Sequence, residues 1–259
     1  MTNEFSKNNS GTRFCALIQA ATRFDKASKS LDTWATYFNV ESVSTRQDRS
    51  HDVAAFLGAG VSELEAMAAA LEAQGVPKNL VEPYTSKAAT AFALSHLANK
   101  WETVVQYFSP DVVLAFKWFA FVLPDEGLEL ADEQLKELVA LVDELKCLLD
   151  DEKLPHPLET FIKGHLRAIE IALHTAPLQG AAPLKKAIRE TFGDANFERE
   201  ELIAAVESAE NPEKAKSLGQ KFEGLWKRVA SVCGDADKIS KGTKAIGEAY
   251  EVVQHLLPW

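Results

Sequence analysis

The sequence predicts an all-α protein, a multi-helix bundle of roughly nine to eleven helices joined by short connections. Three observations lead to this prediction. Apolar residues recur at intervals of three and four over most of the chain, which is the spacing of one helix face. The two-residue alternation of strands is not sustained anywhere. The hydrophobic content of 46% is that of a globular protein with a sizeable core.

The first half begins with a helix predicted over Phe14–Phe38, which Ser10 or Thr12 can cap. A second helix is predicted over Val53–Leu71, and Gly75 is its stop signal.

Pro83 is expected to start the next helix, and Ser109 followed by Pro110 to start another. The latter contains the run Val112–Leu123, which is apolar nearly all round and is therefore expected to be a buried, central helix. Because a bilayer span needs about 20 residues, this shorter run predicts no stable membrane span.

The composition changes at residues 123–127, where aromatic residues become rarer and acidic residues begin. We predict a flexible N-terminus over residues 1–10, an N-terminal helical subdomain over 11–123 and an acidic C-terminal helical subdomain over 124–259. Whether these have two cores or share one stays open.

In the second half, the same spacing predicts helices at 135–149, 158–173, 184–192, 202–206, 218–229 and 239–257. The sequence Phe192-Gly193-Asp194 is expected to end the third of these, and Pro212 to lie near the start of the fifth.

The formal net charge is −10, and residues 123–212 carry the excess acid, with 20 acidic and 9 basic side chains. Nucleic-acid binding requires clustered cations, so this charge argues against a nucleic-acid partner. It favours a protein partner with a basic surface. Residues 213–259, with 8 basic and 6 acidic side chains, are the local exception.

The three cysteines, Cys15, Cys147 and Cys233, are odd in number and far apart, without a C-x-x-C pair. This pattern argues against a disulfide framework and a zinc knuckle, and favours a cytoplasmic location.

His156, His165 and His174 follow one another at nine-residue intervals. Nine helical residues turn about 900°, so neighbours in this series lie on opposite faces, about 13 Å apart along the axis, and cannot share a metal. We predict no metal site. His165 lies at the edge of an apolar face, and with Glu159 and Glu170 it is the candidate for a catalytic group if the protein is an enzyme.

Residues 56–62, FLGAGVS, resemble the glycine-rich loop of sirtuin-like NAD-binding domains, in which Gly58, Ala59, Gly60 and Ser62 would receive the cofactor. That loop requires a preceding strand and a parallel sheet. Here a helical pattern follows, and the T-Q-N and H-G signatures of that family are absent. We therefore predict no cofactor, and interpret Gly58 and Gly60 as positions where another helix approaches closely.

Residues 128–193 resemble a recurrent arrangement in uncharacterised bacterial all-helical proteins, some from mobile or phage-defence loci. The resemblance is carried by Leu158, Leu166, Ile169, Leu173, Gly180, Leu184, Ala187 and Gly193. It implies a bacterial interaction protein of unknown chemistry and assigns no catalytic residue.

These observations favour a non-enzymatic protein-protein interaction, regulatory or immunity subunit, which can also form a homo-oligomer. Two alternatives stay open. One is an enzyme whose site is assembled around His165 from distant helices, and the other is a membrane-acting effector that uses the helix at 112–123.

Overall fold

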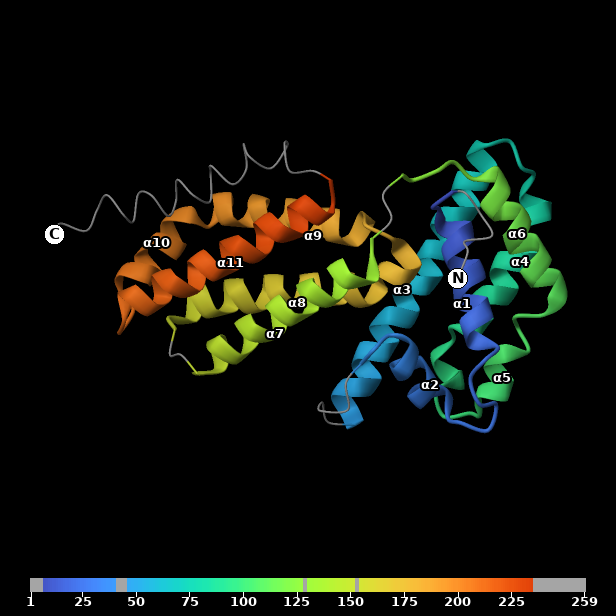
Figure 1. Ribbon diagram of the computed structural model, residues 1–259, viewed down its shortest axis with the longest axis horizontal. Coiled ribbons are helices and arrows are strands. Elements are labelled where there is room, and N and C mark those ends of the chain that lie inside the picture. The colour runs from blue at the N-terminus through green and yellow to red at the C-terminus, as the bar shows by residue number, and fades with distance from the viewer. Residues whose placement is uncertain (1–6, 41–45, 128–129, 152–153, 235–259) are drawn as a thin grey trace. The chain divides into compact units, whose positions relative to one another are not determined.

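The computed structural model describes residues 7–40, 46–127, 130–151 and 154–234. Over these ranges the chain forms eleven α-helices and one 3₁₀ helix, and no strand (Figure 1). The prediction of an all-α fold is therefore confirmed.

Packing divides the chain into two units. The first consists of Met1–Glu129 with His174–Gly180, and the second of Leu130–Leu173 with Ala181–Trp259. The predicted subdomain boundary at residues 123–124 lies shortly before the first division. The helix α8 (His156–Gln179) is therefore divided between the two units. Its residues from His174 onward belong to the first unit, and its earlier residues belong to the second.

The first unit has an aromatic core around Trp34, which is 1% exposed. The Trp34 ring centroid lies 5.2 Å from that of Phe92 and 5.0 Å from that of Trp101. Trp101 Nε1 donates to the Ala21 carbonyl at 2.8 Å, so this buried donor is satisfied. The helices of this unit are α1 (Ser10–Ala21), α2 (Ser30–Tyr37), α3 (Arg46–Ala73), α4 (Lys78–Ala91), η1 (Leu94–His96), α5 (Trp101–Val105) and α6 (Pro110–Val122).

Asn9 caps α1, although Ser10 or Thr12 was expected to do so. Asn9 Oδ1 accepts the Thr12 N–H at 3.0 Å, and Asn9 Nδ2 donates to the Ala120 carbonyl of α6 at 2.9 Å. The predicted flexible N-terminus is therefore held to α6 at its last residues.

The single helix predicted over Phe14–Phe38 is wrong, because α1 and α2 are separate helices. Asp25 lies in the break. Its side chain accepts the Ala27 N–H at 3.1 Å, and its carbonyl accepts the Ser28 N–H at 3.1 Å. Local hydrogen bonds of this kind compete with the helix, and the apolar spacing does not record them.

The end of α3 is confirmed, since Gly75 has a φ of +83° in the left-handed region. The next helix, however, begins at Lys78, and Pro83 lies inside it. The Leu80 N–H closes the first turn on the Pro77 carbonyl at 2.9 Å, so α4 forms a complete turn before the proline.

The helix α6 begins after Ser109 as predicted, but it is not buried all round. One face packs in the unit and contains Val112, Phe116, Phe119 and Ala120. The opposite face presents Leu114, Trp118 and Phe121, which are 69%, 46% and 74% exposed. The expectation that this helix is buried all round is therefore wrong, because its second face is exposed.

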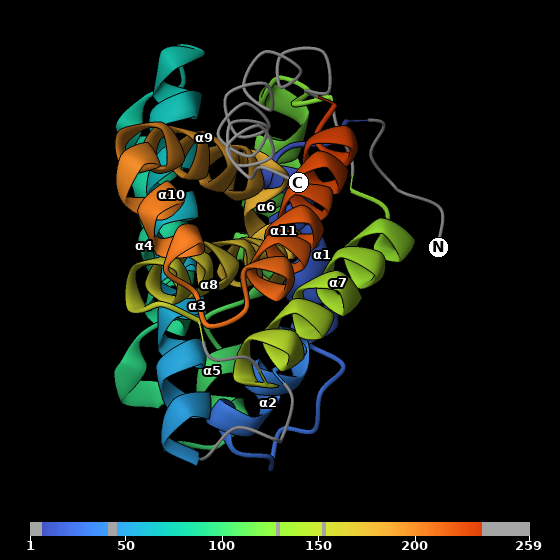
Figure 2. The same ribbon diagram turned by 90° about the vertical axis from the view of Figure 1, so that its left-hand side faces the viewer.

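In the second unit, α7 runs beside α11 (Figures 1 and 2). Leu138, Val142, Leu145 and Leu149 of α7 are buried, as their spacing predicted. Lys221 of α11 pairs with Glu144 of α7 at 2.7 Å. The helices of this unit are α7 (Asp132–Asp151), α8 (His156–Gln179), α9 (Ala182–Phe197), α10 (Arg199–Glu207) and α11 (Pro212–Val232).

The predicted end of the helix at Gly193 is wrong, because α9 continues to Phe197. A Cβ at Gly193 would meet nothing within 4 Å, and the φ angle of Gly193 is not positive. This glycine is therefore an exposed helical residue. The start near Pro212 is confirmed, and the helix predicted over 239–257 lies outside the described residues.

One helix among those described, Arg49–Ala73 within α3, is long and apolar enough to cross a membrane by length and composition. Core helices of soluble proteins have the same properties. The large side chains of α3 are buried in the first unit, among them Val53, Phe56, Leu57, Leu64, Met67 and Leu71.

Candidate functional site

The second unit contains a hollow of about 760 Å³ lined by α8, α9 and α10. The start and middle of α8 contribute His156, Phe161 and His165. The other two helices and their junction contribute the carboxylates of Glu190, Asp194, Glu198 and Glu201. Among the described residues that line the hollow, none is Lys or Arg.

The amphipathic pattern of α8 places His165 at the edge of this hollow. Leu158, Ile162, Leu166 and Ile169 form the buried face of the helix. His165 lies beside that face with a side chain that is 12% exposed. Its ring centroid is 4.4 Å from that of Phe161, one turn earlier, in an edge-to-face arrangement.

Two side chains of α9 face the two nitrogens of His165. Thr191 Oγ1 lies 2.8 Å from His165 Nδ1 and is itself fully buried. Asp194 Oδ2 lies 3.7 Å from His165 Nε2. Burial lowers the pKa of His165 although the charges of Asp194 and Glu190 raise it. The imidazole is therefore neutral at neutral pH.

Glu159 and Glu170, the carboxylates proposed as partners of His165, are engaged elsewhere. Glu159 pairs with Lys163 at 2.8 Å, and this hydrogen bond lowers the pKa of Glu159. Burial raises the pKa of Glu170, but hydrogen bonds and charges from Lys146 and Arg167 outweigh it and lower the pKa. Neither carboxylate is among those that line the hollow.

The sequence did not reveal Thr191 and Asp194 as partners of His165. They lie on another helix, 26 and more residues along the chain, and only the packing of α9 against α8 brings them to the imidazole. The sequence contained only a weak indication of these partners. Glu190 and Asp194 are four residues apart, so they lie on one face of the helix, and Thr191 lies beside that face.

Of the three evenly spaced histidines, His156 and His165 line one hollow and His174 lies elsewhere. His174 Nδ1 lies 2.7 Å from the Phe38 carbonyl, and its ring lies 5.3 Å from that of Phe56. His156 lines the same hollow as His165 although the helical turn between them is about 180°, because the residues of α8 that line the hollow form a wide face with these two histidines at its opposite edges. Over the described ranges, no group of three or more His, Cys, Asp or Glu side chains is arranged to hold a metal ion.

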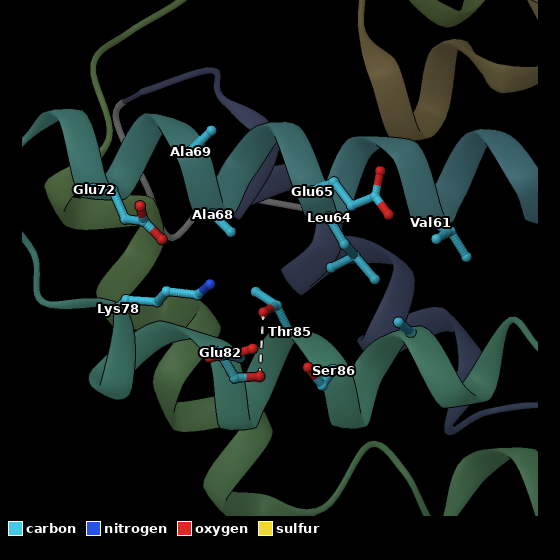
Figure 3. A pocket seen from close by; sticks show the side chains of 11 residues that line it. Val61, Leu64, Glu65, Ala68, Ala69, Glu72, Lys78, Glu82, Thr85 and Ser86 are labelled. Atoms are coloured by element: carbon cyan, nitrogen blue, oxygen red, sulfur yellow. Dashed lines mark hydrogen bonds between the residues drawn. The ribbon is translucent and has the colours of Figure 1, made fainter.

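A second, smaller pocket of about 340 Å³ lies between α3 and α4 in the first unit (Figure 3). Figure 3 shows Glu72 of α3 across from Lys78 of α4, with Glu82 nearby. Thr85 points into it, and its hydroxyl donates to the Val81 carbonyl at 3.3 Å. The charged groups have both signs and are exposed, so this pocket has the chemistry of two solvated helix faces.

The glycines of the FLGAGVS stretch lie inside α3 and not in a loop after a strand. A Cβ at Gly60 would lie 2.5 Å from Cε1 of the Phe92 ring. The predicted close approach at Gly60 is therefore confirmed, although the approaching group is the side chain of Phe92, directly after α4, and not a helix backbone. At Gly58 a Cβ would meet nothing within 4 Å, so the same expectation is wrong for that residue.

Comparisons with protein-family models, with curated proteins and with solved structures find no match for this chain. We therefore infer function from the chemistry of its own residues.

Proposed function

We propose that the protein is a non-enzymatic interaction or regulatory subunit that binds a basic segment of a partner protein in the hollow of α8, α9 and α10. The observation that carries this proposal is the charge of the hollow, which contains four carboxylates and, among the described lining residues, no Lys or Arg. Such a concave acidic surface attracts cations and selects against acidic partners.

The surroundings of His165 favour binding over catalysis. A catalytic imidazole needs a nucleophile or substrate proton within reach and a group that orients it. The hydroxyl that contacts His165 belongs to Thr191, which is fully buried and lies 3.0 Å from the Ala187 carbonyl. It is therefore placed to position the imidazole and not to attack a substrate.

The test is to measure binding of an arginine- and lysine-rich peptide by fluorescence anisotropy at low salt. We expect Glu190→Gln, Asp194→Asn, Glu198→Gln and Glu201→Gln together to weaken binding by roughly tenfold or more, because each exposed charge contributes about 0.2–1 kcal/mol. Salt should weaken binding to the unaltered protein.

The matched control removes four other exposed carboxylates, which are not among the residues that line the hollow. It combines Glu200→Gln, Glu207→Gln, Glu210→Gln and Glu213→Gln, so its net charge changes by the same amount. We expect this control to retain most of the affinity. Equal loss in both variants would show that net charge alone binds the peptide, and absence of binding to the unaltered protein would contradict the proposal.

A second candidate function is contact with a membrane through the exposed face of α6. Leu114, Trp118 and Phe121 recur on one face at intervals of four and three, and apolar side chains of this size insert at a bilayer surface. In a flotation assay with phosphatidylcholine and phosphatidylglycerol vesicles, we expect the protein to float and the variant Trp118→Ser, Phe121→Ser to remain at the bottom.

The control for flotation is Leu80→Ser, Leu94→Ser, which removes two exposed apolar side chains outside α6 that are 52% and 56% exposed. It should float like the unaltered protein. If the unaltered protein does not bind vesicles, the membrane function is excluded and the acidic hollow remains the candidate.

We also propose that the subunit acts in the cytoplasm as part of a bacterial defence or mobile-element system. The support for this setting is the resemblance over residues 128–193. Co-purification of the tagged protein with the products of neighbouring genes tests it directly, and the partner should carry an exposed arginine- or lysine-rich segment.

A further inference from the structure

Thr191 determines which nitrogen of His165 carries the proton. Its Oγ1 lies 3.0 Å from the Ala187 carbonyl and 2.8 Å from His165 Nδ1. A hydroxyl has one proton, and a carbonyl oxygen can only accept. The Thr191 hydroxyl therefore donates to Ala187, and His165 Nδ1–H donates to Thr191. In the neutral imidazole, Nε2 is then an acceptor without a proton.

Nε2 of His165 and Oδ2 of Asp194 form a pair of acceptors. They are 3.7 Å apart, which is beyond hydrogen-bond distance, and both belong to residues that line the hollow. Two acceptors this close repel each other unless a donor lies between them. The pair thus favours a ligand that presents N–H groups to both.

The ring of Phe161 adds a flat apolar surface beside this pair. It also lines the hollow and lies 4.4 Å, centroid to centroid, from the His165 ring. A guanidinium group is planar, presents several N–H donors in a fixed fork and stacks on aromatic faces, whereas an ammonium group is a compact, strongly hydrated charge.

We propose that His165 Nε2 and Asp194 Oδ2 together accept hydrogen bonds from one arginine guanidinium of the bound segment, that Phe161 stacks against it, and that a proton on His165 displaces it. This inference rests on the proposed function, since it names the side chain that the acidic hollow selects and the condition that releases it.

The release follows from the charges around the imidazole. Protonated His165 has no acceptor left, so its contact with the guanidinium is lost, and its positive charge repels the guanidinium and competes with it for Asp194. The charges that act on His165 are those of Asp194 and Glu190 on α9. The other titratable residues that line the hollow are Glu198, Glu201 and His156. Burial lowers the pKa of His165, so release is expected below the usual pKa of histidine, about 6.5.

The experiment uses the full chain and two fluorescent peptides that differ only in having arginine or lysine at every basic position. At about pH 7.5 we expect tighter binding of the arginine peptide, by on the order of tenfold, as for a bidentate compared with a single-point contact. As pH falls below the usual pKa of histidine, about 6.5, we expect this preference to decrease.

The variant His165→Gln should lose the pH dependence of this preference, because an amide side chain does not take up a proton in this range. His51→Gln alters an exposed histidine of α3 that does not line the hollow, and it should keep the pH dependence. Thermal unfolding checks that each variant is folded. If both peptides bind equally at all pH values, or if His165→Gln behaves like the unaltered protein, the inference is wrong while the acidic-hollow function stands. If neither peptide binds, the proposed function itself fails.

The position of the proton on the His165 ring can also be measured in the unaltered protein. Long-range ¹H–¹⁵N correlation of the histidine rings should show the proton of neutral His165 on Nδ1. A proton on Nε2 would overturn the inference, because that nitrogen could not accept from a guanidinium.

Discussion

Arg13 joins four parts of the first unit through its guanidinium group. From α1 it donates through Nε to the Leu178 carbonyl at 2.7 Å, and it pairs with Glu126 at 2.8 Å and with Glu63 of α3 at 3.0 Å. The side chains of Arg13 and Glu63 are only 10% and 14% exposed. Burial raises the pKa of Glu63 against the opposing charge and hydrogen bond of Arg13.

We expect Arg13→Met to lower the free energy of unfolding by about 3 kcal/mol, because it leaves a largely buried carboxylate without its cation. Chemical denaturation near neutral pH measures this. A raised folded-state pKa means that protonating Glu63 stabilises the fold. The unfolding free energy should therefore fall as pH rises from the usual glutamate pKa through the raised one, and this window should extend to higher pH in the variant.

The control for that prediction is the double variant Arg13→Met, Glu63→Gln, which removes the unpaired charge. It should recover part of the lost stability and lose the added pH dependence. An Arg13→Met variant as stable as the unaltered protein would show that the guanidinium contributes little.

At the scale of elements, α1 crosses α6 at Gly11. A Cβ on this residue would lie 2.5 Å from the backbone nitrogen of Ala120 and 2.7 Å from its Cα. Backbone cannot move aside as a flexible side chain can, so the crossing distance depends on glycine at this position.

We expect Gly11→Ala to destabilise the protein by about 1–3 kcal/mol through overpacking at this crossing. Gly58→Ala is the matched control, since Gly58 is an exposed helical glycine whose Cβ would meet nothing within 4 Å. It should stabilise by about 0.5–1 kcal/mol, because alanine loses less backbone entropy in a helix. A Gly11→Ala variant that unfolds at the same temperature as the unaltered protein, or at a higher one, would contradict the crossing geometry.

Periodicity predicted which segments are helical and, for an amphipathic helix such as α7, which face is buried, but it did not predict where every helix stops. The pattern predicted one helix where α1 and α2 are separate, because apolar residues keep the helical spacing across the turn at Asp25. The predicted end of α9 was too early, because Gly193 was interpreted as a stop signal. Periodicity could not show that Leu114, Trp118 and Phe121 face outward, since an all-apolar helix carries no information about its exposed side.

At the scale of the whole molecule, the composition showed that residues 123–212 are acidic, but it did not show which basic residues pair with their carboxylates. Glu137 and Glu144 of α7 pair with Arg228 and Lys221 of α11, so basic residues that follow residue 212 neutralise part of the acidic helix. The carboxylates around the hollow lie on other helices, and His165 was identifiable from its place on α8. Its acceptor pair with Asp194 required the tertiary packing of α9 on α8.

The contact between Asn9 and Ala120 spans 111 positions of the chain. During translation, α1 therefore emerges from the ribosome long before α6, and the buried ring of Phe14 must wait for Phe116 of α6, whose ring centroid lies 5.5 Å from its own. The first unit consequently closes late in its own synthesis, and a chaperone that binds nascent apolar segments would find α1 exposed until then.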